Sequence, residues 1–209
     1  MTFVASDLST PDGADGLVAA AAEHGGVDVL VNNAGAVTVH PEGFASLTDD
    51  DWQASWDLNV MGVVRTTRAA LPAMYKRGGG SIVIVGSVNA YFPRSGHIRL
   101  LRHQGRRHEH REGIVKANWG RRTFASTRSA RDRCRPGCGS DDGGVADSIA
   151  GASGQTPAEV RASTAGAAAT GRFTTPEQVA DLVVFLASDR SGNITGSDLR
   201  IDGGLVTTL

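Results

Sequence analysis

The sequence predicts an α/β protein with a doubly wound parallel sheet. Three observations lead to this prediction: short runs of β-branched apolar residues, helical segments between these runs, and polar residues or glycines where the runs end. Strands that alternate with helices form a parallel sheet covered by helices on both faces. A length of 209 residues is that of one domain.

Four segments are expected to form strands. Residues 27–31 and 81–87 are short apolar runs rich in β-branched side chains, which is typical of buried parallel strands. Residues 3–8 have the pattern of a strand that enters a loop. A turn over residues 193–198 precedes the last expected strand at 199–202.

Four helices are expected from their start signals. Thr10, Thr156 and Thr175 each stand before a proline, and an acidic residue follows closely. A threonine side chain accepts a hydrogen bond from a free N–H group of the first turn, and a proline has no N–H group that needs a partner. These residues therefore mark the beginning of a helix. Asp49 opens a longer helix that is expected to continue to Met74.

Between residues 97 and 140 the chain changes character. This tract contains 11 of the 19 arginines, and it has no hydrophobic period that fits a helix or a strand. Its two cysteines, Cys134 and Cys138, form a single CxxxC pair without the further ligands of a metal site. We therefore expect an atypical basic segment and no bound metal.

The composition of the whole chain sets limits on its partners. A net charge of -1 and a pI near 6.6 give no overall attraction to nucleic acid or anionic membranes. The basic tract has no recognisable nucleic-acid-binding motif. The sequence shows neither an apolar run of membrane-spanning length nor a signal peptide. We expect a cytoplasmic protein that binds neither nucleic acid nor membrane.

Four motifs occur in the order in which one enzyme family has them. DVLVNNAG at residues 28–35 resembles the strand-end signature of the short-chain dehydrogenase/reductase family. Asn59 in WDLNVMG resembles the family's active-site asparagine helix, and Ser87 at the end of GSIVIVGS resembles its catalytic-serine strand. The segment from Gly171 to Gly204 resembles the family's C-terminal stretch. The resemblance covers most of the chain.

The resemblance implies a Rossmann-like sheet in a single domain over residues 1–209, with NAD or NADP bound at the carboxyl ends of the strands. By resemblance, Asn33, Ala34 and Gly35 contact the cofactor, and the Asp7 carboxylate accepts from the adenine amino group. Small residues let the backbone approach a cofactor closely. Two other interpretations stay open: Asn33 could only pin neighbouring strands, and Asp7 could only serve the helix entry.

The resemblance also gives two residues a catalytic role. Ser87 would donate a hydrogen bond to the substrate's carbonyl oxygen and stabilise the charge that develops there during hydride transfer. Asn59 would hold a water molecule in a proton relay. Without the resemblance, a serine at a strand end is usually a turn residue. An asparagine within a helix is more often a packing or bulge residue.

Two parts of the family pattern are absent from the sequence. No glycine-rich fingerprint precedes the first motif, so we expect an N-terminally truncated, incomplete sheet without the first strand, glycine-rich turn and second strand. The family's Tyr-x-x-x-Lys pair is also missing, because Leu100 and Gln104 stand at its expected place. Tyr91 is too close to Ser87 in sequence, and Lys116 is too far along, to replace that pair.

The genetic code offers a reason for the missing pair. Residues 100–105 can be encoded CTA CTC CGC CAC CAA GGC, which read one base later gives Tyr-Ser-Ala-Thr-Lys. Residues 124–136, read two bases later, permit a sequence that resembles the family's next strand and its Pro-Gly loop. The original frame has returned by Asp141. Our hypothesis is that residues from about Ile98 to Ser140 are frame-shifted coding sequence.

The motifs together predict an NAD(P)-dependent oxidoreductase that moves a hydride between a nicotinamide cofactor and a small carbonyl or alcohol substrate. A 3-oxoacyl-type reductase and a broad alcohol dehydrogenase fit equally well, and the family implies a homo-oligomer. We expect the chain as written to be inactive, because the Tyr-x-x-x-Lys pair is missing. The alternative is a non-catalytic, degenerate fragment of such an enzyme.

Overall fold

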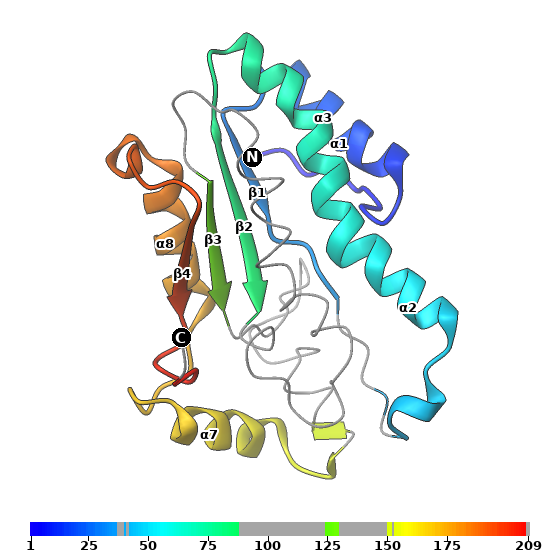
Figure 1. Ribbon diagram of the computed structural model, residues 1–209, viewed down its shortest axis with the longest axis vertical. Helices are drawn as coiled ribbons and strands as arrows, with labels where there is room; N and C mark the ends of the chain where they lie inside the picture. Colours follow the sequence, from blue (N-terminus) through cyan, green and yellow to red (C-terminus); the bar gives the residue numbers. More distant parts are fainter. Residues whose placement is uncertain (37–39, 41, 88–123, 130–149, 152, 208–209) are drawn as a thin grey trace.

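The computed structural model describes residues 1–36, 40, 42–87, 124–129, 150, 151 and 153–207. Four parallel strands form one sheet in the order β1-β2-β3-β4 (Figure 1). Their bounds are Val29–Asn32, Ser81–Ser87, Phe124–Ser129 and Ser197–Ile201. Because all four strands run in the same direction, their carboxyl ends meet at one edge of the sheet, the lower edge in Figure 1.

Three of the predicted strands are present. The strand predicted over residues 81–87 is confirmed as β2, and those predicted at 27–31 and 199–202 correspond to β1 and β4 with slightly different bounds. β4 begins at Ser197, inside the segment that was predicted to be a turn. Short apolar runs locate strands well because they are the parts of the chain that a sheet can bury.

Residues 3–8 do not form the predicted strand. They take no part in the four-stranded ladder, and Phe3 is 73% exposed. An apolar run becomes a strand only where a neighbouring strand satisfies its N–H and C=O groups. In the described sheet the outer position on this side is taken by β1, so the segment leads directly into the first helix.

β3 lies inside the tract in which neither a helix nor a strand was expected. Its backbone pairs on both sides, since Ala125 is level with Val83 of β2 and with Ser197 of β4. The expectation is therefore wrong for residues Phe124–Ser129. Two neighbouring strands provide hydrogen-bond partners for the N–H and C=O groups of β3. This pairing does not require a hydrophobic period in the sequence.

The helices begin where the sequence signals them. Thr10, Thr156 and Thr175 cap three helices, each by accepting a hydrogen bond from the N–H three residues further on. In the described part of the chain the helical segments, including two short 3₁₀ turns, are α1 (Pro11–Glu23), η1 (Phe44–Ser46), α2 (Asp49–Trp56), η2 (Asp57–Met61), α3 (Gly62–Lys76), α7 (Pro157–Ala167), α8 (Pro176–Ala187) and η4 (Asp189–Ser191).

The long helix predicted from Asp49 is present but is not regular throughout. Thr48 and Asp51 form a reciprocal capping box at its start. In η2 the helix widens to a π-helical turn, which closes with a bond from the Gly62 N–H to the Asp57 carbonyl. Such turns occur frequently at functional sites because they redirect backbone and side chains locally.

Two apolar clusters attach helices to opposite faces of the sheet. Ile82 of β2 packs with Ala70 and Met74 of α3, whereas its neighbour Val83 packs with Leu186 of α8. Successive residues of a strand point to opposite faces, so α3 and α8 lie on opposite sides of the sheet (Figure 1). α1 packs against α3.

Among the described residues, the edge strand β1 is covered on one face only. Leu30 packs into the cluster on the α3 side, whereas Val29 and Val31 are each 39% exposed. On their side of the sheet, α8 packs over β2 and β3. The prediction that residues 27–31 are buried is therefore wrong for this face of the strand.

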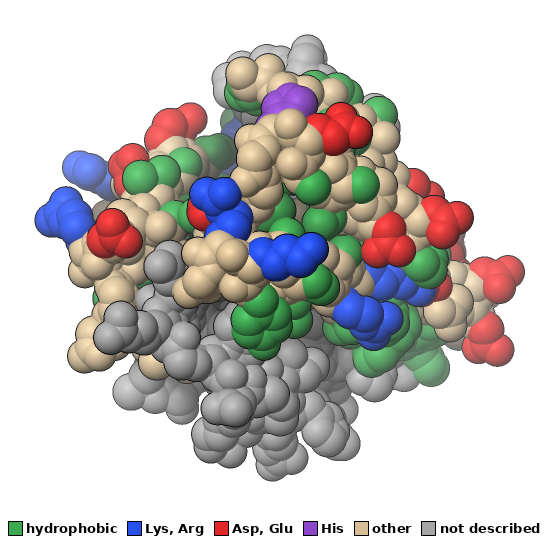
Figure 2. Space-filling model, turned by 90° about the horizontal axis from the view of Figure 1, so that it is seen from above, with side chains coloured by type: hydrophobic (Ala, Val, Ile, Leu, Met, Phe, Trp, Pro, Cys, Tyr) green, Lys and Arg blue, Asp and Glu red, His purple; other side chains and the backbone are tan. Residues whose placement is uncertain are grey.

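The end of the molecule at which the strands begin is shown in Figure 2. Lys and Arg side chains lie there among Asp and Glu, with apolar side chains between them. The described side chains on this face therefore do not form a region of one sign. Ser87 and residues 33–35, which were predicted to be functional, lie at the other end, where the strands finish.

Candidate active site

Four of the six predicted functional residues lie where two neighbouring strands end. Residues 33–35 follow β1 directly and are exposed, and Ser87 is the half-buried last residue of β2. Asn32 of β1 is level with Ile84 of β2, so Ser87 lies three positions further along the same edge. The carboxyl edge of a parallel sheet is where α/β proteins bind their ligands.

Asn32 anchors the end of β1 to α3. Its Oδ1 accepts from the Thr66 hydroxyl at 2.6 Å, and its Nδ2 donates to Thr67 Oγ1 at 3.3 Å. Asn32 and Thr66 are both buried, where a paired amide contributes to stability and an unpaired one would be costly. Asn32 thus joins β1 to a helix. The pinning of neighbouring strands that was considered for Asn33 stays a prediction.

Asn59 connects η2 to the loop after β1. Its Oδ1 accepts from the Ala36 N–H at 2.9 Å, and its Nδ2 donates to the Ala36 carbonyl at 2.9 Å and to the Ser55 carbonyl at 3.0 Å. A Cβ added at Gly35 would lie 3.0 Å from Asn59 Oδ1, so glycine permits this close approach. The amide therefore positions the loop, as a bulge residue would. Its water-holding role stays a prediction.

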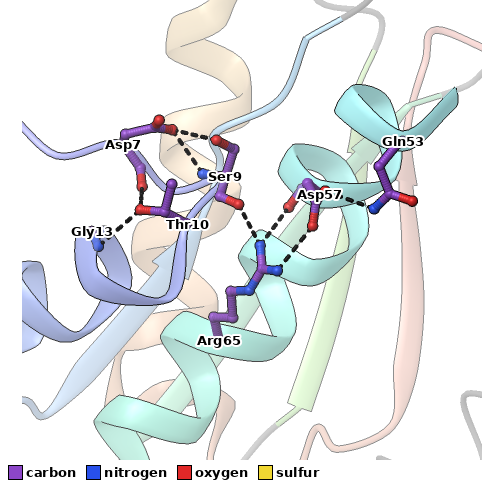
Figure 3. Close-up of polar contacts among 7 residues, drawn as sticks. All are labelled: Asp7, Ser9, Thr10, Gly13, Gln53, Asp57 and Arg65. Carbon is purple, nitrogen blue, oxygen red and sulfur yellow. Dashed lines mark hydrogen bonds and ion pairs between the residues drawn. The ribbon is translucent and has the colours of Figure 1, made fainter. Parts of the chain in front are cut away.

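Asp7 forms a closed loop with the residues that follow it. Its Oδ1 accepts from the Ser9 N–H at 2.9 Å and from the Ser9 hydroxyl at 2.6 Å, and its backbone carbonyl accepts from the Thr10 hydroxyl at 2.9 Å (Figure 3). Thr10 in turn caps α1. Asp7 thus serves the helix entry, and its side chain is also exposed to solvent.

The Asp7 carboxyl is ionised at neutral pH. The hydroxyl of Ser9 and then its N–H, both donating to the carboxylate, hold the pKa of Asp7 below its ordinary value of 3.8. Because the folded pKa is lowered, the stabilisation is present above the ordinary value and is lost as the pH falls through the lowered one. Asp7 is therefore an anionic hydrogen-bond acceptor throughout the neutral range.

Asp57 and Arg65 join this loop to η2, and neither was predicted from the sequence as a site residue. Arg65 donates through Nη2 to Asp57 Oδ1 at 2.9 Å and through Nη1 to the Ser9 carbonyl (Figure 3). The available signal was a pair of opposite charges about two turns apart on one predicted helix. No sequence pattern indicated the contact with Ser9, which lies 56 residues earlier.

Several residues of the sequence analysis lie outside the described residues. They are Tyr91, Leu100, Gln104, Lys116, Cys134 and Cys138. Most of the tract proposed to be frame-shifted lies outside them as well, apart from β3.

The described residues contain neither a metal-binding cluster nor a membrane-spanning helix. In the ranges that the structure describes, no group of three or more His, Cys, Asp or Glu side chains is placed to hold a metal ion. Of the helices in the same ranges, none has both the length and the apolar character to cross a bilayer.

Two family models match the chain. Residues 1–98 match the model described as short chain dehydrogenase, and residues 143–206 match the model described as enoyl-(acyl carrier protein) reductase. The two matches stand on either side of the basic tract. Together they contain every residue that the sequence analysis proposed for the site.

Known proteins resemble the chain along most of its length. The 3-oxoacyl-[acyl-carrier-protein] reductase FabG of Thermotoga maritima is 31% identical, over 88% of this chain and 68% of its own. L-sorbose reductase of Gluconobacter frateurii, whose structure is a complex with NADPH and L-sorbose, is 29% identical with a TM-score of 0.75, over 99% of this chain and 77% of its own. The fold also matches aldohexose dehydrogenase of Thermoplasma acidophilum, with a TM-score of 0.83 and 23% identity, over 99% of this chain and 78% of its own.

The parallel sheet, its polar carboxyl edge and these likenesses define a Rossmann-like oxidoreductase that uses NAD or NADP. The chain belongs to the short-chain dehydrogenase/reductase family.

Proposed function

We propose that the loops at the carboxyl edge bind NAD or NADP and that Ser87 acts on a carbonyl or alcohol substrate beside the nicotinamide. Asp7 would accept a hydrogen bond from the adenine amino group, and residues 33–35 would contact the dinucleotide. The observation that carries this proposal is that both loops are fixed to one helix: Asn59 bonds to the loop after β1, and Arg65 bonds to the loop after Asp7.

The residues present fit a dinucleotide in two respects. Residues 33–35 are exposed, and Ala34 and Gly35 are small, so a ligand can approach the backbone there closely. Asp7 is exposed and carries a carboxylate that is ionised at neutral pH, which suits an N–H donor. The bound dinucleotide would supply the hydride donor or acceptor of the reaction.

Ser87 offers a hydroxyl donor at the tip of β2. Donation to the substrate's carbonyl oxygen would stabilise the negative charge that develops there. Asn59 would contribute by keeping the loop after β1 in place, through its bonds to Ala36 and Ser55. In this proposal Ser87 touches the reacting atoms, and Asn59 positions the wall of the site and holds the predicted relay water.

We further propose that the chain as written does not turn over. A general acid must lie within hydrogen-bond reach of the oxygen that it protonates, and Leu100 and Gln104 stand where the family has its tyrosine and lysine. A frame-shift over residues 98–140 would account for both replacements.

The test compares two chains: the chain as written, and a chain in which residues 98–140 are translated from the shifted frame. Both are assayed for oxidation of NADH and NADPH with a 3-oxoacyl thioester and with simple ketones. We expect turnover only in the second chain, and a loss of about 100-fold or more when Ser87→Ala is added to it. Turnover by the mass-verified chain as written would contradict the proposal. So would gene codons that cannot give Tyr and Lys in the shifted frame.

A second candidate is a non-catalytic, degenerate fragment of such an enzyme. The observation that favours it is the pair Leu100 and Gln104 at the place of the catalytic residues. A degenerate fragment would bind neither NADH nor NADPH and would give the circular-dichroism spectrum of an unfolded chain. Dinucleotide binding by the folded chain separates the first candidate from the second.

The wider setting of the activity also belongs to the proposal. We propose a cytoplasmic homo-oligomer in which residues 1–209 form a single domain and a small carbonyl compound is the substrate. The homo-oligomer is proposed from the resemblance to the family alone. The relatives leave the substrate class open between a 3-oxoacyl group and a sugar carbonyl. Light scattering of the purified chain measures the oligomeric state.

A further inference from the structure

Arg65 spans two parts of the site that are far apart in sequence. Its side chain is only 16% exposed and reaches from α3 across η2 to the loop before α1. One end of the guanidinium donates to the Ser9 carbonyl, and the other donates to Asp57 Oδ1 at 2.9 Å (Figure 3). Asp57 is itself held by Gln53, whose Nε2 donates to its Oδ2 at 2.7 Å.

The loop that Arg65 reaches is the loop that presents Asp7. Ser9 is fixed on both sides of its backbone: its carbonyl accepts from Arg65, and its N–H donates to Asp7 Oδ1 at 2.9 Å. The carbonyl of Leu8 lies against Gly62, where an added Cβ would be only 3.1 Å away. The position of Asp7 therefore depends on the first turn of α3 through direct contacts.

The same helix also holds the other loop of the site. Asn59 bonds to both backbone polar groups of Ala36, directly after residues 33–35. Arg65 and Asn59 thus connect two loops, which come from different parts of the chain, to one short stretch of helix. A ligand that touches both loops must find them at a fixed separation, and rigid placement lowers the cost of binding.

We propose that Arg65 is a positioning residue that sets Asp7 against the loop at residues 33–35, so that the two loops bind one dinucleotide together. The inference rests on the proposed function and adds a residue to it. A guanidinium suits this role because its planar fork donates in two directions at once. A lysine at the same place has a single ammonium and cannot reproduce both bonds with the same geometry.

The test is a double-mutant cycle on the full chain with NADH and NADPH as probes. Binding is followed by nucleotide fluorescence, and urea unfolding of every variant shows that it is folded under the conditions of the titration. We expect Arg65→Ala to weaken binding about tenfold and Arg65→Lys to weaken it less. Arg68→Ala, at an exposed position of the same helix, is the matched control and should leave binding unchanged.

The cycle distinguishes positioning from a general structural effect. If Arg65 acts through Asp7, Arg65→Ala will have little further effect on binding in the Asp7→Ala background. Additive effects of the two substitutions would overturn the inference. If Arg65→Ala does not fold, Asp57→Asn, which removes the charge that holds the guanidinium, takes its place in the cycle with the same expectation.

The failure of this inference differs from the failure of the proposed function. If the unsubstituted, folded chain binds neither nucleotide, the proposed function is wrong and this inference falls with it. If that chain binds and Asp7→Ala weakens binding, but Arg65→Ala and Asp57→Asn have no effect, only the positioning role is wrong.

Discussion

Gly13 has room for a hydrogen atom and for nothing larger. A Cβ at this position would lie 1.9 Å from the carbonyl oxygen of Asp7. Gly16, one turn further along α1, has no such neighbour within 4 Å. Glycine weakens a helix, so its presence at position 13 is explained by the close approach of the loop that presents Asp7.

At Gly13 we predict that substitution by alanine lowers the free energy of unfolding by about 1–3 kcal/mol, because the loop and the helix must move apart. Gly16→Ala is the matched control, and it should raise the same quantity by up to about 1 kcal/mol, since alanine is the better helix former. Urea unfolding of the two variants measures both effects. Equal effects at the two positions would show that the loop does not pack against α1 as described.

At the scale of elements, the parts that the sequence predicted well are those with local causes. Thr156 and Thr175 begin helices through bonds to residues only three positions away, and the run at 81–87 is apolar enough to be buried anywhere in a sheet. Residues 3–8 and β3 were predicted wrongly because strand formation depends on partners that are distant in sequence. The hydrogen bond from Arg65 to the Ser9 carbonyl was not predicted for the same reason.

The edge strand β1 allows a direct test of this arrangement. Leu30 packs into the cluster on the α3 side, whereas its neighbour Val31 is 39% exposed on the other face. We predict that Leu30→Ala costs about 2 kcal/mol of unfolding free energy and that Val31→Ala costs well under half of that. Thermal or urea unfolding measures the difference. A larger cost at Val31 would mean that β1 is turned the other way or is not an edge strand.

At the scale of the whole molecule, the segments that match the family on either side of the basic tract meet in one sheet. β1 and β2 come from residues 1–98, β4 comes from residues 143–206, and β3 pairs with β2 on one side and β4 on the other. The carboxyl edge of this sheet was predictable from the polar residues after each apolar run. The hydrogen bonds by which η2 and α3 hold the loops that lead to this edge could not be predicted from the sequence.

The central claim is that this edge of the sheet binds a nicotinamide dinucleotide. Titration of the full chain with NADH and NADPH, followed by nucleotide fluorescence, tests it most directly. We predict saturable binding of at least one of the two, and a weakening of about tenfold in Asp7→Ala, as expected for the loss of one charge-assisted hydrogen bond. A chain that unfolds cooperatively in urea, and is therefore folded, but binds neither nucleotide would contradict the claim.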